Sequence, residues 1–158
     1  MDISVVAVGK LRRYYREAFD DYAHRLQRYV TFHEHEVREA SRAPTATAQR
    51  AEEAERLSAR IPKASNMVAL ARVGAGWTSA DLAQQLERWL LLARPLTFVL
   101  GGSHGLDTHL ISGAVASWSL GPLTLPHELA RVVVGEQLYR AFTILRGEPY
   151  HKGLGSKV

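Results

Sequence analysis

The chain has 158 residues and a mass of 17.6 kDa, which is the size of one ordinary domain. Apolar residues make up 46% and charged residues 23%, a balance that excludes a disordered protein, a collagen-like repeat and a coiled coil. The sequence holds no run of about 18 apolar residues that could cross a membrane, and it opens without the pattern of a signal peptide. Because cysteine is absent, disulfides and thiolate metal sites are excluded, and we expect a cytoplasmic protein.

The charge favours a nucleic-acid partner. Lysine and arginine outnumber aspartate and glutamate by 20 to 16, and the sequence pI is near 9.6. Clustered cations attract polyanions at long range and release counterions on binding. The cations that gather near the two ends of the sequence are Lys10, Arg12, Arg13, Arg16, Arg131, Arg140, Arg146, Lys152 and Lys157. The alternative interpretation is an ordinary solvated rim.

Hydrophobic periodicity predicts strands that alternate with helices. In chain order, the pattern indicates a strand over 3–8, a helix over 15–30, a strand over 32–37, a helix from Thr45 or Thr47 to Ile61, a strand over 66–73, a helix over 78–93, a strand over 96–100 and a long helix over 126–147. Such alternation predicts a single α/β domain whose mostly parallel sheet is covered by helices on both faces.

Turn and capping residues mark the ends of these elements. Gly74 and Gly76 interrupt the third strand, and Thr78 has the position of a helix N-cap. Asp107 is placed to cap a helix after the fourth strand, and Pro126 suits the first turn of the last helix. Since parallel sheets bind ligands beyond the carboxyl ends of their strands, we expect the functional loops at that edge.

The most specific local motif is the glycine-rich segment GGSHG at 101–105, which directly follows the fourth strand. It lacks the spacing of a dinucleotide-binding loop and the lysine of a P-loop. One interpretation is a tight turn, and another is a loop whose backbone approaches a ligand closely. The segment also fits the G-x-S-x-G pattern of a hydrolase nucleophile elbow, with Ser103 as the nucleophile.

Two further groups of residues are open to two interpretations. His33 and His35 lie on one face of a strand, as a metal pair would, but no third ligand is evident nearby. We therefore expect an exposed strand face and no metal. In the last helix, Arg131, Glu136 and Arg140 form either a structural ion-pair network or a pocket for phosphate or a base edge.

Several segments together resemble a known family. They are VAVGK at 6–10, LGGSHGL at 100–106, LTLPHELARV at 123–132, EQLYRA at 136–141 and PYHK at 149–152. In this order and at this spacing they resemble the ribosomal RNA large subunit methyltransferase H family of the SPOUT superfamily. The resemblance spans nearly the whole chain.

The resemblance implies an α/β knot, in which the C-terminal part of one domain over 1–152 forms a trefoil knot, an exception to the rule that chains do not thread their own loops. It also implies a homodimer and a flexible tail over 153–158. The implied activity transfers a methyl group from S-adenosylmethionine to N3 of a pseudouridine in 23S ribosomal RNA. We expect the RNA to be presented by the large subunit or the whole ribosome, because the domain is small.

The resemblance also implies which residues form the site. Three loops would bind the cofactor through Leu70, Gly101, Leu120, Gly121, Pro122, Leu123, Thr124 and Leu125. Arg131 and Arg140 are expected to orient phosphates or the base, and Tyr150 to stack on it. His151 is the candidate base for the proton on N3. The alternatives are an RNA-binding knot protein without catalysis and a hydrolase that uses Ser103.

Overall fold

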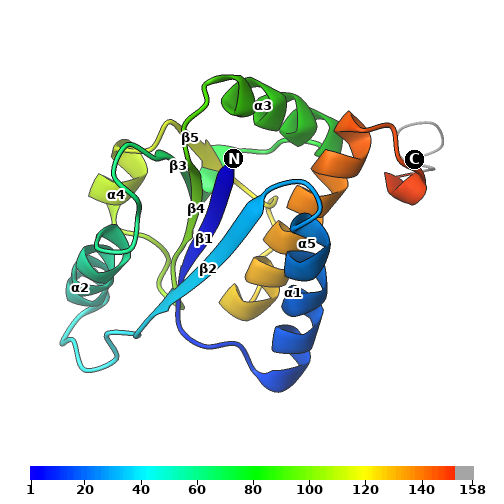
Figure 1. Ribbon diagram of the computed structural model, residues 1–158. Coiled ribbons are helices and arrows are strands. Elements are labelled where there is room, and N and C mark those ends of the chain that lie inside the picture. Colours follow the sequence, from blue (N-terminus) through cyan, green and yellow to red (C-terminus); the bar gives the residue numbers. More distant parts are fainter. Residues whose placement is uncertain (152–158) are drawn as a thin grey trace.

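The computed structural model describes residues 1–151, and five parallel strands form its single sheet, in the order β2-β1-β4-β3-β5 (Figure 1). The strands are β1 (Asp2–Val8), β2 (Thr31–Val37), β3 (Asn66–Ala75), β4 (Leu96–Leu100) and β5 (Ala116–Trp118). All four neighbouring pairs are parallel, which confirms the predicted α/β class. The carboxyl ends of the strands therefore share one edge.

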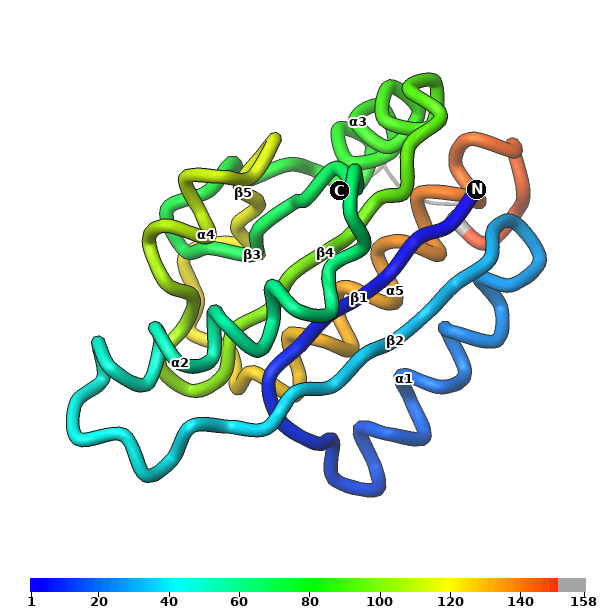
Figure 2. Tube along the Cα trace, turned by 60° about the vertical axis from the view of Figure 1, so that its left-hand side comes forward, coloured from blue at the N-terminus to red at the C-terminus, as the bar shows by residue number. Residues whose placement is uncertain are grey.

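Helices cover both faces of the sheet. They are α1 (Arg13–Leu26), α2 (Ala46–Ser58), α3 (Ser79–Leu91), α4 (Thr108–Ser112) and α5 (His127–Leu145), followed by the 3₁₀ helix η1 (Pro149–His151). Figure 2 shows α1 and α5 on one side of the strands and α2 and α4 on the other. The core side chains of α3 belong to the same cluster as those of α1 and α5.

Alternation along the strands explains this two-sided packing, because successive side chains of a strand point to opposite faces. Ile3 and Val5 of β1 join the cluster beneath α1, α3 and α5, whereas Val6 and Val8 join the cluster beneath α2 and α4. All four side chains have an exposed fraction of 1% or less, so β1 is buried on both faces. Such strands read as continuous apolar runs, as the sequence of β1 does.

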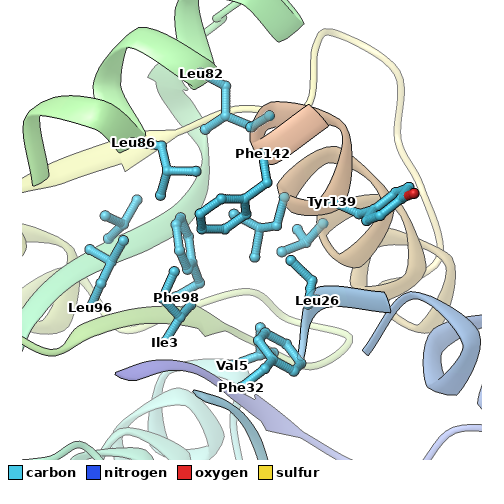
Figure 3. Close-up of a cluster of buried hydrophobic side chains, with 14 of the residues drawn as sticks. Ile3, Val5, Leu26, Phe32, Leu82, Leu86, Leu96, Phe98, Tyr139 and Phe142 are labelled. Atoms are coloured by element: carbon cyan, nitrogen blue, oxygen red, sulfur yellow. The ribbon is translucent and has the colours of Figure 1, made fainter. Parts of the chain in front are cut away.

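The larger cluster joins the sheet to three helices (Figure 3). Phe98 of β4 and Leu86 of α3 are fully buried, and Phe142 of α5 is 4% exposed. Tyr29 stacks on Phe142 with their ring centroids 5.1 Å apart. Contacts of this kind fix α5 between α1 and α3, so the first turn of α5 has a defined position at the carboxyl edge of the sheet.

The predicted element boundaries agree with the structure to within a few residues, but β5 and η1 are missing from the predicted elements. Thr78 caps α3 in a capping box with Asp81, and Asp107 caps α4, as the sequence predicts. The strand β5 was not predicted, because three residues are too short to show a hydrophobic period. None of the helices within residues 1–151 has the length and apolar character needed to cross a membrane.

Candidate active site

Three segments that lie far apart in the sequence meet at the carboxyl edge of the sheet and line a hollow of about 150 Å³. They are residues 70–72 of β3, the chain between β5 and α5, and the first turn of α5. The lining residues are Leu70, Ala71, Arg72, Ser119, Leu120, Gly121, Leu123, Thr124, Leu125 and Ala130. Most of this surface is aliphatic side chain or backbone, which suits a flat apolar group with polar edges.

A second hollow, of about 320 Å³, lies beside the first and is lined by the glycine-rich segment 101–105. The two hollows share Leu70, Arg72, Thr124, Leu125 and Ala130, and His127 also lines the second. Residues 70–72 of β3 and the chain segments that follow β4 and β5 therefore line one continuous region. This arrangement brings together seven of the eight residues predicted for cofactor binding; the eighth, Pro122, is exposed and lines neither hollow.

The glycine-rich segment is a tight turn in which the backbone passes close to itself. A Cβ at Gly101 would lie 2.4 Å from the carbonyl carbon and oxygen of Gly105, so only glycine fits there. A backbone bridge joins Gly102 to Gly105, and the Ser103 hydroxyl donates to Glu39 at 3.2 Å. The turn thus presents backbone to the hollow and is held from behind by the loop after β2.

The segment 119–125 is attached to the sheet where β5 ends. The Ser119 amide donates to the carbonyl of Ala75 at 2.9 Å, and the Gly121 amide donates to the Ser119 hydroxyl at 3.1 Å. Gly121 has φ +113°, a backbone conformation that other residues rarely adopt. Leu123, beyond this turn, is 77% exposed at the rim of the hollow.

The first turn of α5 is fastened to the loop after β1. Glu128 accepts the backbone amide of Arg12 at 2.6 Å and forms an ion pair with its side chain at 3.2 Å. One turn later, Arg131 donates to the carbonyls of Val8 and Gly9 at 3.1 and 2.9 Å. These bonds hold the start of α5, and with it the end of the segment that lines the hollow.

Arg131 is the centre of a buried ion-pair network, since its side chain is only 1% exposed. It pairs with Glu34 and Glu36 of β2, and Arg16 of α1 pairs with the same two carboxylates. Burial lowers the pKa of the Arg16 guanidinium, but hydrogen bonds to Glu34 and Asp20 outweigh it and raise that pKa above its ordinary value. Of the two sequence interpretations, Arg131 takes the structural one, because its guanidinium is enclosed by protein groups.

Arg140 and Tyr150 form a separate group near the end of α5. The Arg140 guanidinium pairs with Glu136 at 2.6 Å and lies 4.9 Å above the Tyr150 ring, whose hydroxyl donates to Glu136 at 3.1 Å. Burial raises the pKa of the Tyr150 phenol, and hydrogen bonds with Tyr22 and Glu136 raise it further. Tyr150 is therefore a neutral hydrogen-bond donor at physiological pH.

This group does not lie at the hollow of its own chain. Ala130 lines the hollow, and Arg140 follows it along α5 by about 15 Å at 1.5 Å per residue. Figure 1 shows α5 running from the carboxyl edge of the strands toward the opposite side of the molecule. His151 ends η1, and the structure describes only its backbone; the predicted tail over 153–158 lies outside the described residues.

The geometry around Ser103 differs from a nucleophile elbow. Its hydroxyl donates to a carboxylate instead of an imidazole, and α4 begins only at Thr108, with Asp107 as its cap. His33 and His35 do share a strand face, with ring centroids 6.2 Å apart. Within residues 1–151 no three histidine, aspartate or glutamate side chains come together as a metal site.

The fold and this edge of the sheet define a class of enzyme. Residues 1–151 match the family described as "Predicted SPOUT methyltransferase", and the chain belongs to that family. A solved structure described as a probable methylase family protein from Haemophilus influenzae is similar in fold, with a TM-score of 0.52 and 13% identity. The match covers 95% of this chain and 70% of that one.

More closely similar proteins carry a particular name. Ribosomal RNA large subunit methyltransferase H from an Anaeromyxobacter species is 46% identical, over 96% of this chain and 100% of its own length. The protein of the same name from Chromobacterium violaceum is 39% identical, over 96% of this chain and 99% of its own. These full-length matches confirm the family that the sequence motifs indicate.

The residues at the hollow fit S-adenosylmethionine, the methyl donor of SPOUT methyltransferases. Leu70, Leu120 and Leu125 offer apolar contacts to an adenine ring, and the glycine turn, whose close backbone approach a Cβ at Gly101 would prevent, lines the second hollow. Sequence reasoning missed Arg72 and Ala130, which line both hollows. The sequence does show Arg72 as a charged residue within an apolar strand. It does not show that the Arg72 side chain lines the two hollows.

Proposed function

We propose that this chain transfers a methyl group from S-adenosylmethionine to N3 of a pseudouridine in 23S ribosomal RNA, and that it acts as a homodimer in the cytoplasm. The observation that carries the proposal is the hollow at the carboxyl edge of the sheet, lined by three loops in a chain whose named relatives match it end to end. In this proposal residues 1–152 form one catalytic domain.

The cofactor residues we propose are Leu70, Gly101 and the segment 120–125. When bound, S-adenosylmethionine supplies a methyl group on a sulfonium sulfur, and in-line transfer depends above all on alignment. The leucines of the hollow pack against the adenine, and the backbone of the glycine turn and of segment 119–121 forms hydrogen bonds with its polar edge. Exclusion of water from this apolar lining strengthens those hydrogen bonds.

We propose that the chain is knotted at this point. β5 is the edge strand, yet the helix that follows it packs between α1 and α3 over the middle of the sheet. The connecting segment 119–126 lines the same hollows as residues 70–72 of β3 and the glycine turn. In this proposal the segment passes through a loop of the chain before it forms α5, and this threading makes the trefoil knot that the family resemblance implies.

The second subunit supplies the substrate residues. In one chain, Arg140 lies about 15 Å along α5 from the hollow, and Tyr150 of η1 packs beside it. The exposed apolar side chains of Val73 and Leu123, which are 89% and 77% exposed, lie in the segments that form the hollow and suit a protein interface. A dimer across this region brings the partner's Arg140 and Tyr150 to the target base.

In that arrangement each substrate residue has one task. Arg140, held by Glu136, orients a phosphate or the base, and Tyr150, whose hydroxyl donates to Glu136, stacks its ring on the base. The imidazole of His151 accepts the proton from N3, so that the nitrogen lone pair is free to bond to the methyl carbon. Arg131 acts through its ion pairs and keeps the first turn of α5 in position.

The proposal predicts one missing methyl group in cells that lack this gene. Mass spectrometry of nuclease fragments of their 23S RNA should find a single pseudouridine without its N3 methyl, and the gene on a plasmid should restore it. An intact methylation pattern in the deletion strain contradicts the proposed function. An RNA-binding protein without catalysis would leave the RNA unchanged and show no affinity for S-adenosylmethionine in calorimetry.

The expected substrate is the assembled particle, because a small domain gains most from a surface that is already folded. Purified protein should methylate ribosomes or large subunits from the deletion strain at least about tenfold faster than naked 23S RNA, a difference of about 1.4 kcal/mol in the barrier. Equal rates on all three would reject this part of the proposal.

A further inference from the structure

Residues 71–74 of β3 depart from regular pairing with β5, and this short excursion places Arg72, a charged residue without an assigned role, at the hollow. Leu70 and Ala75 both pair with Trp118 of β5, so residues 71–74 leave the regular ladder between them. Gly74 fixes the base of this excursion, because a Cβ there would lie 2.6 Å from the carbonyl carbon of Ser117. The excursion is thus pressed against β5 and does not depend on its own side chains for its position.

Arg72 is the side chain of this excursion that lines both hollows. All other residues around the first hollow are aliphatic, glycine, serine or threonine. The second hollow adds the imidazoles of His104 and His127 but no carboxylate and no further lysine or arginine. The one permanent charge in the lining described for either hollow is therefore positive.

The Arg72 guanidinium also differs from the arginines of the ion-pair networks, because none of the ion pairs described within residues 1–151 gives it an acidic partner. Arg16, Arg131 and Arg140, in contrast, each pair with glutamate. The Arg72 side chain is exposed, so its charge stays hydrated and the lack of an acidic partner has little desolvation cost in the free protein. It is available for an anion that enters the hollow.

We propose that Arg72 binds the carboxylate of the methionyl part of S-adenosylmethionine; this rests on the proposed function. The ligand carries a positive sulfonium, a positive ammonium and one carboxylate. A fixed cation repels the first two groups and attracts the third, so it selects one orientation of the methionyl chain. The planar guanidinium matches a carboxylate with two parallel hydrogen bonds, which an ammonium cannot reproduce.

Calorimetric titration of the full chain with two ligands tests this assignment. S-adenosylmethionine and its decarboxylated analogue share the adenosine and the sulfonium and differ only in the group assigned to Arg72. The variants are Arg72→Ala and Arg72→Lys. The control is Arg94→Ala, an exposed arginine just before β4 and hence at the opposite edge of the sheet.

Arg72→Ala should weaken binding of S-adenosylmethionine by about tenfold, which corresponds to the loss of one charge-assisted pair, and change binding of the analogue less than twofold. The affinity of Arg72→Lys for S-adenosylmethionine should lie between those of Arg72→Ala and the wild type. Arg94→Ala should bind both ligands as the wild type does. Equal affinity of Arg72→Ala and wild type for S-adenosylmethionine overturns the inference. So does an equal loss with both ligands, which would mean that Arg72 shapes the hollow.

A methylation assay at varied ribosome concentration distinguishes the carboxylate of S-adenosylmethionine from an RNA phosphate as the anion that Arg72 binds. If Arg72→Ala binds S-adenosylmethionine normally but needs more ribosome for half-maximal methylation, the anion belongs to the RNA and the assignment is wrong. Failure of the wild type to bind S-adenosylmethionine at all would instead reject the proposed function. The two failures are therefore distinguishable in the same set of titrations.

Discussion

Replacement of Arg131 with methionine is expected to lower the free energy of unfolding by about 3 kcal/mol, a usual cost of breaking a buried ion pair. Methionine fills much of the same volume but leaves Glu34 and Glu36 without their buried partner and the carbonyls of Val8 and Gly9 without a donor. Urea unfolding followed by circular dichroism measures the loss.

Two comparisons test the physical cause. Arg25→Met removes an exposed pair with Asp21 and should cost less than about 1 kcal/mol. Within residues 1–151, Arg131→Met leaves Arg16 as the one remaining ion-pair partner of the two carboxylates. Adding Glu34→Gln and Glu36→Gln should therefore recover part of the loss, because the excess negative charge is then gone. An Arg131→Met protein as stable as Arg25→Met would show that the network contributes nothing.

Replacement of Gly101 with alanine is expected to weaken S-adenosylmethionine binding by about 100-fold, or about 2.7 kcal/mol. The new Cβ would lie 2.4 Å from the backbone of Gly105, so the turn must open and its backbone must leave the hollow. Calorimetry gives the affinity, and urea unfolding shows whether the fold survives.

Gly113→Ala is the matched control for this variant. A Cβ at Gly113 would meet its nearest atom, the His109 carbonyl oxygen, at 3.5 Å, which is an ordinary contact. Its affinity for S-adenosylmethionine should equal that of the wild type. If Gly101→Ala also binds normally, the glycine turn is not part of the cofactor site.

Much of the fold could be predicted because its signals are local. The apolar runs of β1 and β4 are long enough to identify buried strands, and the caps at Thr78 and Asp107 fix where helices begin. β5 has only three residues, and its pairing with β3 over Leu70 and Ala75 depends on contacts that are distant in sequence. Hydrophobic periodicity along the sequence cannot predict which strands pair across such a distance.

The candidate site also has features that the sequence predicts and features that depend on contacts distant in sequence. The edge of the sheet at which a ligand should bind was predictable, because a parallel sheet gathers the carboxyl ends of its strands there, whereas the individual residues proposed for the cofactor came from the family resemblance. The role of Arg131 was not, since its partners Glu34 and Glu36 lie on β2 and the charge pattern of α5 fits either a network or a pocket. The distance of Arg140 from the hollow of its own chain follows from its spacing along α5, but only once Ala130 is known to line that hollow.

The most direct measurement is a crystal structure of this protein with S-adenosylhomocysteine, the demethylated cofactor. The ligand should lie with its adenine between Leu70 and the segment 120–125, against the turn at Gly101, with a chain threaded between these loops. Ligand density in the separate groove that Ala54, Ile61 and Leu110 line between α2 and α4 would contradict the account. So would an unthreaded chain whose three loops lie apart around no ligand.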